Sequence, residues 1–173
     1  MFLKPLAEDE ESYKLLYTFT KENNPMWKQV FLKSVCKEKI NLETLSDFEY
    51  FKLLYNTQKT YESVLSKNYM LIINGKPLVN IYIMMRTSNI ADISFITHRN
   101  HRKKGFATIA LNMLEQMLFC NPNILFTTIM DLTPNKITSK IALKSGYTFN
   151  EDTNYFIKAN PNINLEDLIE NKR

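Results

Sequence analysis

The segment between Ile93 and Leu111 gathers most of the residues of this chain that are suited to binding an anion. An apolar, strand-like start is followed by the basic stretch His98–Lys104, and a single glycine, Gly105, leads into an apolar helical pattern. Backbone N–H groups at a helix start have no partner within the helix and favour an anion there. Gly105 permits a close approach to the backbone, and the small side chain of Ala107 leaves room beside the helix. The segment therefore predicts a phosphate or pyrophosphate site.

Hydrophobic periodicity and turn residues predict the helices and strands around this segment. Asn74 and Gly75 form a strong hairpin signal, Thr44 or Ser46 can cap a helix, and Gly146 stands where helices use a left-handed cap. The predicted strands cover residues 2–7, 69–73, 77–86, 90–97, 124–130, 147–150 and 155–158. The predicted helices cover residues 8–23, 27–40, 45–65, 106–119, 134–145 and, in the tail, 165–170. This order predicts an α+β domain.

The length of 173 residues fits one domain, which we divide into an N-terminal part (1–67), a core (68–158) and a polar tail (159–173). With 45% hydrophobic and 23% charged residues, the composition is typical of a soluble globular protein. The formal net charge of +4 is too mild to demand nucleic acid. No apolar run approaches the ~20 residues that a membrane-spanning helix needs. Because the N-terminus also turns acidic early, we expect a cytoplasmic protein.

Metal and redox sites are not indicated. The two cysteines, Cys36 and Cys120, lack the spacing of a metal or redox motif, and we expect them to be reduced. His98 and His101 form an H-x-x-H pattern in the basic loop. A zinc site would need further ligands, so we expect a solvent-facing pair and no metal.

The run Arg102-x-x-Gly105-x-Ala107 resembles the pyrophosphate-binding signature of the GNAT family of N-acetyltransferases, Q/R-x-x-G-x-G/A. The wider stretch is most similar to the branch that acetylates ribosomal proteins. Four downstream residues fall at the spacing of the family's N-x-x-S/A…G-F segment: Asn135, Thr138, Gly146 and Tyr147. The resemblance covers residues 69–158 and implies a mixed, mostly antiparallel central sheet flanked by helices, with acetyl-CoA as co-substrate. It also implies transfer of an acetyl group to a primary amine by direct attack in a ternary complex.

The resemblance further implies which residues hold acetyl-CoA. The strand before the basic loop should splay from its neighbour, often through a bulge. An N–H group near Phe95 or Ile96 should point at the thioester oxygen and stabilise the oxyanion. The implied cofactor-binding residues are Phe95, Ile96, Thr97, Arg102, Lys103, Lys104, Gly105, Phe106, Ala107, Thr108 and Asn135.

Catalysis on an amine requires a proton acceptor, because an alkyl ammonium has a pKa near ~10. Asp92 and Ser94 share one face of the strand 90–97, so Asp92 is a candidate base and Ser94 a candidate for holding a relay water. The alternative is that Asp92 is a solvated residue near the strand start. Many family members carry a tyrosine seven positions after the motif asparagine, where it can act as a general acid and protonate the leaving thiolate. This chain has Ala142 at that position. Tyr147 is the nearest replacement in the sequence.

Three hypotheses about function therefore remain. The first is an N-acetyltransferase with an unidentified amine acceptor, whose pocket would be shaped by the N-terminal helices, with Trp27 as one candidate for its lining. The second is a CoA-binding or sensing module without turnover, which Ala142 motivates. The third, a nucleic-acid-binding domain that uses the basic loop, is disfavoured because CoA phosphates explain the basic residues more economically. The chain could act as a monomer or a homodimer.

Overall fold

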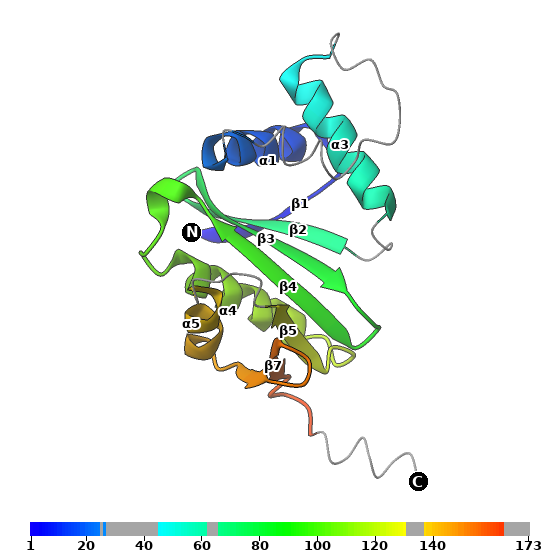
Figure 1. The fold of residues 1–173 in the computed structure, drawn as a ribbon, viewed down its shortest axis with the longest axis vertical. Helices are drawn as coiled ribbons and strands as arrows, with labels where there is room; N and C mark the ends of the chain where they lie inside the picture. Colours follow the sequence, from blue (N-terminus) through cyan, green and yellow to red (C-terminus); the bar gives the residue numbers. More distant parts are fainter. Residues whose placement is uncertain (25, 27–44, 62–65, 131–136, 165–173) are drawn as a thin grey trace.

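The computed structural model describes residues 1–24, 26, 45–61, 66–130 and 137–164 (Figure 1). Trp27, Cys36, Asn135 and the helices expected at 27–40 and 165–170 lie outside the described residues. The elements follow one another as β1 (Phe2–Leu6), α1 (Glu10–Asn23), α3 (Asp47–Tyr61), β2 (Ser66–Ile73), β3 (Lys76–Met85), β4 (Ile90–Thr97), a 3-10 turn η2 (Arg99–His101), α4 (Phe106–Phe119), β5 (Phe126–Met130), α5 (Ile137–Lys144), β6 (Thr148–Asn150) and β7 (Tyr155–Ala159). The predicted α+β order is confirmed.

The strands form one sheet in the order β1-β2-β3-β4-β5-β7-β6. The pair β4–β5 is parallel and the other pairs are antiparallel, so the sheet is mixed and mostly antiparallel, as the resemblance implied. The hairpin between β2 and β3 turns at Asn74 and Gly75, whose φ angles are 51° and 74°. Two positive φ angles in succession are what a tight two-residue hairpin requires, so this turn prediction is confirmed.

The pair β4–β5 is short because the two strands separate. Pairing runs from Ile90–Phe126 to Asp92–Thr128, although β4 continues to Thr97. We call residues 93–97 of β4 and 129–130 of β5 the β4–β5 divergence. The register between β3 and β4 is unbroken along the whole of β4, so the expected bulge is not found on that side. A register shift lies instead between β2 and β3, at Leu71/Ile72.

Helices cover the two faces of the sheet, with α1 and α3 on one face and α4 and α5 on the other (Figure 1). The face under α4 and α5 carries the larger core cluster, to which Ile81, Ile93 and Leu111 belong. A second cluster, with Phe19 and Phe51 at its centre, joins α1 and α3 to β2. Side chains alternate along β4, so one strand contributes to the main core and also places Asp92 and Ser94 on the opposite face of the sheet. None of the helices in the described part of the chain could span a membrane.

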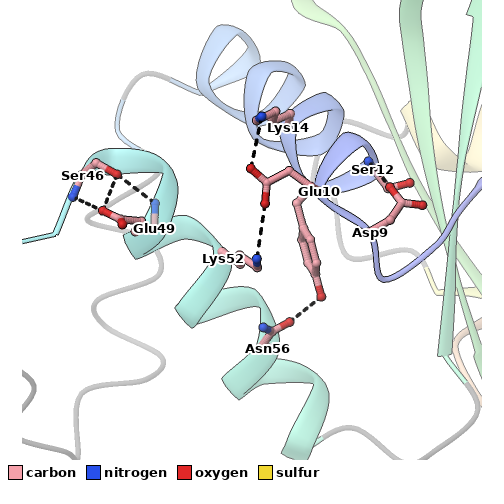
Figure 2. Close-up of polar contacts among 9 residues, drawn as sticks. Asp9, Glu10, Ser12, Lys14, Ser46, Glu49, Lys52 and Asn56 are labelled. Carbon is pink, nitrogen blue, oxygen red and sulfur yellow. Dashed lines mark hydrogen bonds and ion pairs between the residues drawn. The ribbon is translucent and has the colours of Figure 1, made fainter.

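The two N-terminal helices begin at well-formed caps (Figure 2). Asp9 caps α1, and its Oδ1 accepts a hydrogen bond of 2.7 Å from the backbone N–H of Ser12. Ser46 and Glu49 form a reciprocal capping box before α3: Glu49 N–H donates to Ser46 Oγ at 3.3 Å, and Ser46 N–H donates to Glu49 Oε2 at 2.9 Å. Ser46 therefore caps α3, as one of the two sequence proposals had it, and Thr44 lies outside the described residues.

Polar contacts then join α1 to α3 (Figure 2). Tyr13 donates its hydroxyl hydrogen to Asn56 Oδ1 at 2.6 Å. Glu10 lies between Lys14 and Lys52, at 3.1 and 3.5 Å. Such exposed ion pairs contribute little to stability, so the apolar second cluster carries most of the attachment of this helix pair to the sheet.

Candidate cofactor and catalytic site

The connection from β4 to α4 is built from backbone conformations that aim N–H groups outward. After η2, Lys103 and Gly105 adopt left-handed φ angles of 62° and 79°. Gly105 is the N-cap of α4 and supplies no side-chain hydrogen bond. The first bond of the helix runs from Ile109 N–H to the Gly105 carbonyl at 3.1 Å. The N–H groups of the preceding helical turn, residues 106–108, therefore have no partner inside α4.

The side chains around this helix start fit an anionic ligand. Arg102, Lys103 and Lys104 are exposed, and Arg102 Nε donates to the Thr97 carbonyl at 3.3 Å. A Cβ built on Gly105 would meet nothing within 4 Å, so the space beside this residue is open. Ala107 is 6% exposed, which means that its side chain packs inside the protein and that its N–H is the group left for a ligand. Phe106 and Thr108 are half-buried.

The direction of the β4 amides follows from its pairing with β3. His98 N–H donates to the Leu78 carbonyl at 2.8 Å, and Arg86 N–H donates to the Ile90 carbonyl at 3.0 Å. Hydrogen-bonded positions alternate along an antiparallel ladder, so the even-numbered residues of β4 direct their N–H and C=O groups to β3. The odd-numbered residues direct theirs to the opposite side, where β5 has separated. Phe95 is one of them.

The end of β4 thus supplies main-chain groups of two kinds. The N–H of Phe95 faces the β4–β5 divergence, whereas the N–H of Ile96 belongs to the ladder with β3. The side chain of Phe95 packs against the main core, and that of Ile96 is 44% exposed. Of the two amides that the sequence offered for the thioester oxygen, the register therefore favours Phe95.

Asp92 and Ser94 share the face of β4 opposite to the main core, as the strand period predicted. Ser94 is exposed, whereas the Asp92 side chain is 15% exposed. Arg86 Nε and Nη2 both donate to Asp92 Oδ2, at 3.0 and 2.8 Å, and Thr128 Oγ1 donates to Oδ1. Asp92 is therefore not the solvated carboxylate of the alternative hypothesis. Its role as a base stays a prediction, and both of its oxygens are engaged.

Tyr147 lies in the main core and is 3% exposed. Its hydroxyl is 3.0 Å from Thr127 Oγ1, and burial, reinforced by nearby Glu115, raises the pKa of the phenol well above its ordinary value. Ala142 is fully buried in the same cluster. The tyrosine considered as a general acid is thus enclosed by core side chains, which argues against that role.

Comparison with known proteins supports the architecture. No family model matches the chain, and no curated protein matches its sequence. Solved structures do match. One is a spermidine N-acetyltransferase SpeG chimera from Vibrio cholerae and hSSAT, at 13% identity over 94% of this chain and 98% of that chain, with a TM-score of 0.62. Another is RimL, a ribosomal L7/L12 α-N-protein acetyltransferase in complex with coenzyme A, at 11% identity over 91% and 93%, with a TM-score of 0.63. A third is an acetyltransferase of the GNAT family from Streptococcus pneumoniae, at 12% identity over 91% and 98%, with a TM-score of 0.59.

The chain has the GNAT fold. The likeness covers more than nine-tenths of the chain in these three comparisons, and it therefore includes the N-terminal helices. Within this fold, β4, the basic loop and α4 occupy the part of the sequence that carries the Arg102-x-x-Gly105-x-Ala107 signature. The second matched segment is placed in part, since α5 and its end are described and Asn135 is not.

The GNAT fold of this chain has one contact region that sequence reasoning missed, between the end of α1 and the basic loop. His98 Nδ1 accepts from Asn100 N–H at 3.4 Å, so Nε2 carries the hydrogen and donates to Glu22 Oε2 at 3.1 Å. Arg99 N–H donates to Asn23 Oδ1 at 2.7 Å. These bonds fix the loop against the helix pair on the other side of β4.

The histidines of this loop differ from the expected solvent-facing pair. His98 is 6% exposed and its ring packs against Phe19, so the prediction of exposure is wrong for this residue. The reason is the packing of α1, which no local pattern around His98 reveals. Partial burial, with Lys104 nearby, lowers the pKa of His101. Across the residues that the structure describes, no group of three or more His, Cys, Asp and Glu side chains could hold a metal ion.

Proposed function

We propose that this chain is an acetyl-CoA-dependent N-acetyltransferase that transfers an acetyl group to a primary amine by direct attack in a ternary complex. The observation that carries the proposal is the start of α4, which has no side-chain cap and follows the strand β4. The Phe95 amide of that strand faces the β4–β5 divergence. A helix start offers N–H groups and a positive dipole to a phosphate. A strand with free main-chain groups offers hydrogen bonds to an extended, amide-containing chain.

In this proposal β4, the basic loop and the start of α4 each bind a different part of acetyl-CoA. The N–H groups of residues 106–108, with the cations of Arg102, Lys103 and Lys104, bind the pyrophosphate. Thr97 and Phe95 contribute main-chain bonds to the pantetheine arm, and the Phe95 N–H stabilises the negative charge that develops on the thioester oxygen. The amine approaches from the face of β4 that carries Ser94, which is exposed and can hold a water on the path of the departing proton.

The acceptor is assigned by chemistry alone, as an amine that must lose a proton before it attacks. The solved structures with this fold include one described as acting on spermidine and one described as acting on a ribosomal protein. Both act on amines, and a primary amine is therefore the acceptor class that we propose here.

One observation favours a second function, a CoA-binding module without turnover. Tyr147 and Ala142 are both buried in the main core, so neither position offers a phenol to the leaving thiolate. The lack of a phenol would not affect the binding of acetyl-CoA. It would lower only the rate of acetyl transfer. A thiol has a pKa near ~8.5 and can leave as the anion, so we keep the enzyme as the main proposal.

The experiment that separates these functions uses the purified full chain in two assays. Calorimetric titration with acetyl-CoA measures binding, and release of free thiol in the presence of a panel of polyamines, peptide N-termini and lysine derivatives measures turnover. We expect saturable binding and thiol release with at least one amine. Binding without release from any amine would support the sensing module, and no binding at millimolar acetyl-CoA would refute both.

The basic loop also requires a test for nucleic acid. Binding to oligonucleotides that falls steeply with salt and is not displaced by acetyl-CoA would support the third hypothesis. We expect acetyl-CoA to displace any such binding, because both ligands would use the exposed cations of residues 102–104.

A further inference from the structure

A connected group of four side chains lies where β4 and β5 begin to separate, which we call the Arg86 bridge. Arg86, just after β3, donates two hydrogen bonds to Asp92 of β4, at 3.0 and 2.8 Å. Thr128 of β5 donates to the other oxygen of Asp92. The guanidinium carbon of Arg86 lies 4.1 Å from the ring centroid of Tyr155 in β7. The bridge thus joins side chains from four successive parts of the sheet.

The Arg86 bridge lies at the point where the pairing of β4 with β5 ends. Asp92 and Thr128 form the last register pair between β4 and β5, so their hydrogen bond closes the parallel pairing. Beyond this pair, the β4 amides that would continue it face the divergence. Phe95 is three residues further along β4, about 10 Å away at ~3.3 Å per residue. Any change in the point of separation therefore changes the position of the Phe95 amide.

The same bonds make Asp92 poorly suited to act as a base. Oδ2 accepts two hydrogen bonds from the Arg86 guanidinium, at 3.0 and 2.8 Å. Oδ1 accepts from Thr128 Oγ1. An amine that gave its proton to Asp92 would therefore have to reach the remaining lone pair of Oδ1, on a side chain that is only 15% exposed.

We propose that Asp92 is a positioning residue: together with Arg86 and Thr128 it fixes where β4 and β5 separate, and so places the Phe95 amide for the thioester. The functional part of this inference rests on the proposed acetyl-CoA site. The mechanical part, that the bridge holds the two strands together at their last pair, stands on the contacts alone.

The mechanical part is tested by hydrogen exchange on the full chain without ligand. In Asp92→Asn, Arg86→Met and Thr128→Val, we expect amides of the β4–β5 pair to exchange at least tenfold faster, with the β1–β2 pair unchanged. The matched control is Glu11→Gln, which removes the Lys4–Glu11 ion pair of 2.6 Å at the other edge of the sheet and should leave β4 and β5 unchanged. Wild-type exchange rates in β4 and β5 of all three bridge variants would overturn the proposal, whatever the protein binds.

The functional part is tested by kinetics of the same variants. If Asp92 is a positioning residue, the three bridge variants should behave alike. In each of them kcat should fall at least fivefold, because the displaced Phe95 amide acts in the transition state, and the pH profile of kcat should keep its wild-type inflection. If Asp92 is the base, Asp92→Asn alone should lose most of kcat and the pH dependence, while Thr128→Val stays near wild type; that result would overturn the proposal. A wild type that neither binds nor turns over acetyl-CoA would refute the proposed function and leave the exchange result to decide on the bridge.

Discussion

The glycine at the start of α4 offers the sharpest test of the cofactor site, because a second glycine serves as its control. Gly105 is the N-cap of α4, and Gly146 follows the end of α5. Their φ angles are nearly equal, at 79° and 81°. A Cβ on Gly105 would meet nothing within 4 Å, and a Cβ on Gly146 would meet Lys158 at an ordinary contact distance of 3.8 Å. Alanine at either position therefore imposes the same backbone strain without a clash.

Both alanine variants should lower the melting temperature by a similar amount. A non-glycine residue in the left-handed region costs about 1–2 kcal/mol. At roughly 2–4 °C per kcal/mol for a chain of this length, each variant should melt about 2–8 °C below the wild type. Acetyl-CoA at about 100 times its Kd stabilises the native state by about 2.7 kcal/mol, or roughly 5–11 °C.

The two variants should then differ in their response to ligand. A methyl group on Gly105 lies at the helix start that we assign to the pyrophosphate, and we expect Kd to rise at least tenfold. At the same acetyl-CoA concentration the remaining stabilisation is about 1.4 kcal/mol or less, so the thermal shift falls to half or below. Gly146→Ala should keep the full shift. Melting curves of the three proteins, with and without acetyl-CoA, provide the measurement.

Two results would contradict the assignment of a phosphate to the start of α4. A full shift in Gly105→Ala would mean that no phosphate approaches this residue, and the start of α4 would lose its assignment. An equal loss in Gly105→Ala and Gly146→Ala would mean that destabilisation alone weakens binding. In the first case the exposed cations near Gly105 would need another explanation.

Two further predictions concern the core beneath the site. Tyr147→Phe removes the partner of the buried Thr127 hydroxyl and should cost about 1–3 kcal/mol in urea unfolding. Because burial raises the pKa of Tyr147, the unfolded state loses its proton first; wild-type stability should fall above about pH 10, by up to ~1.4 kcal/mol per pH unit, and the variant should fall less steeply. Lys158→Met leaves the 5%-exposed Glu115 carboxylate without its cation and should cost about 3–5 kcal/mol, much of which Glu115→Leu on the same background should restore.

Much of the fold could be predicted because its signals are local. The strand at 90–97 and the helix at 106–119 were predicted with the bounds that the structure shows, since alternation, a basic loop and a glycine mark their limits. The capping role of Ser46 and the turn at Asn74 and Gly75 follow from short motifs in the same way. The helix start that we assign to phosphate is also local, so the sequence sufficed to find it.

The contacts that orient the site were not predictable, because their partners are distant in the sequence. His98 and Glu22 are 76 residues apart, and Asp92 and Thr128 are 36 residues apart. No periodicity or motif pairs such residues; the register of β4 with β5 and the packing of α1 bring them together. The sequence therefore offered Asp92 as a candidate base or a solvated residue, and the structure shows it bonded on both oxygens.

The position of the general acid shows how a correct spacing argument can still mislead. Residues seven apart in a helix lie on nearly the same face, but spacing does not say what that face contacts. Here the helix end decides it: Tyr147 N–H donates to the Ala142 carbonyl and Gly146 N–H donates to the Leu143 carbonyl, both at 3.1 Å, which is the Schellman arrangement around a left-handed glycine. This turn places Ala142 against the main core and directs Tyr147 into it. An enzyme built on this chain would release the thiolate without a phenol from either position, so its rate should depend on the Phe95 amide more than on any side-chain acid.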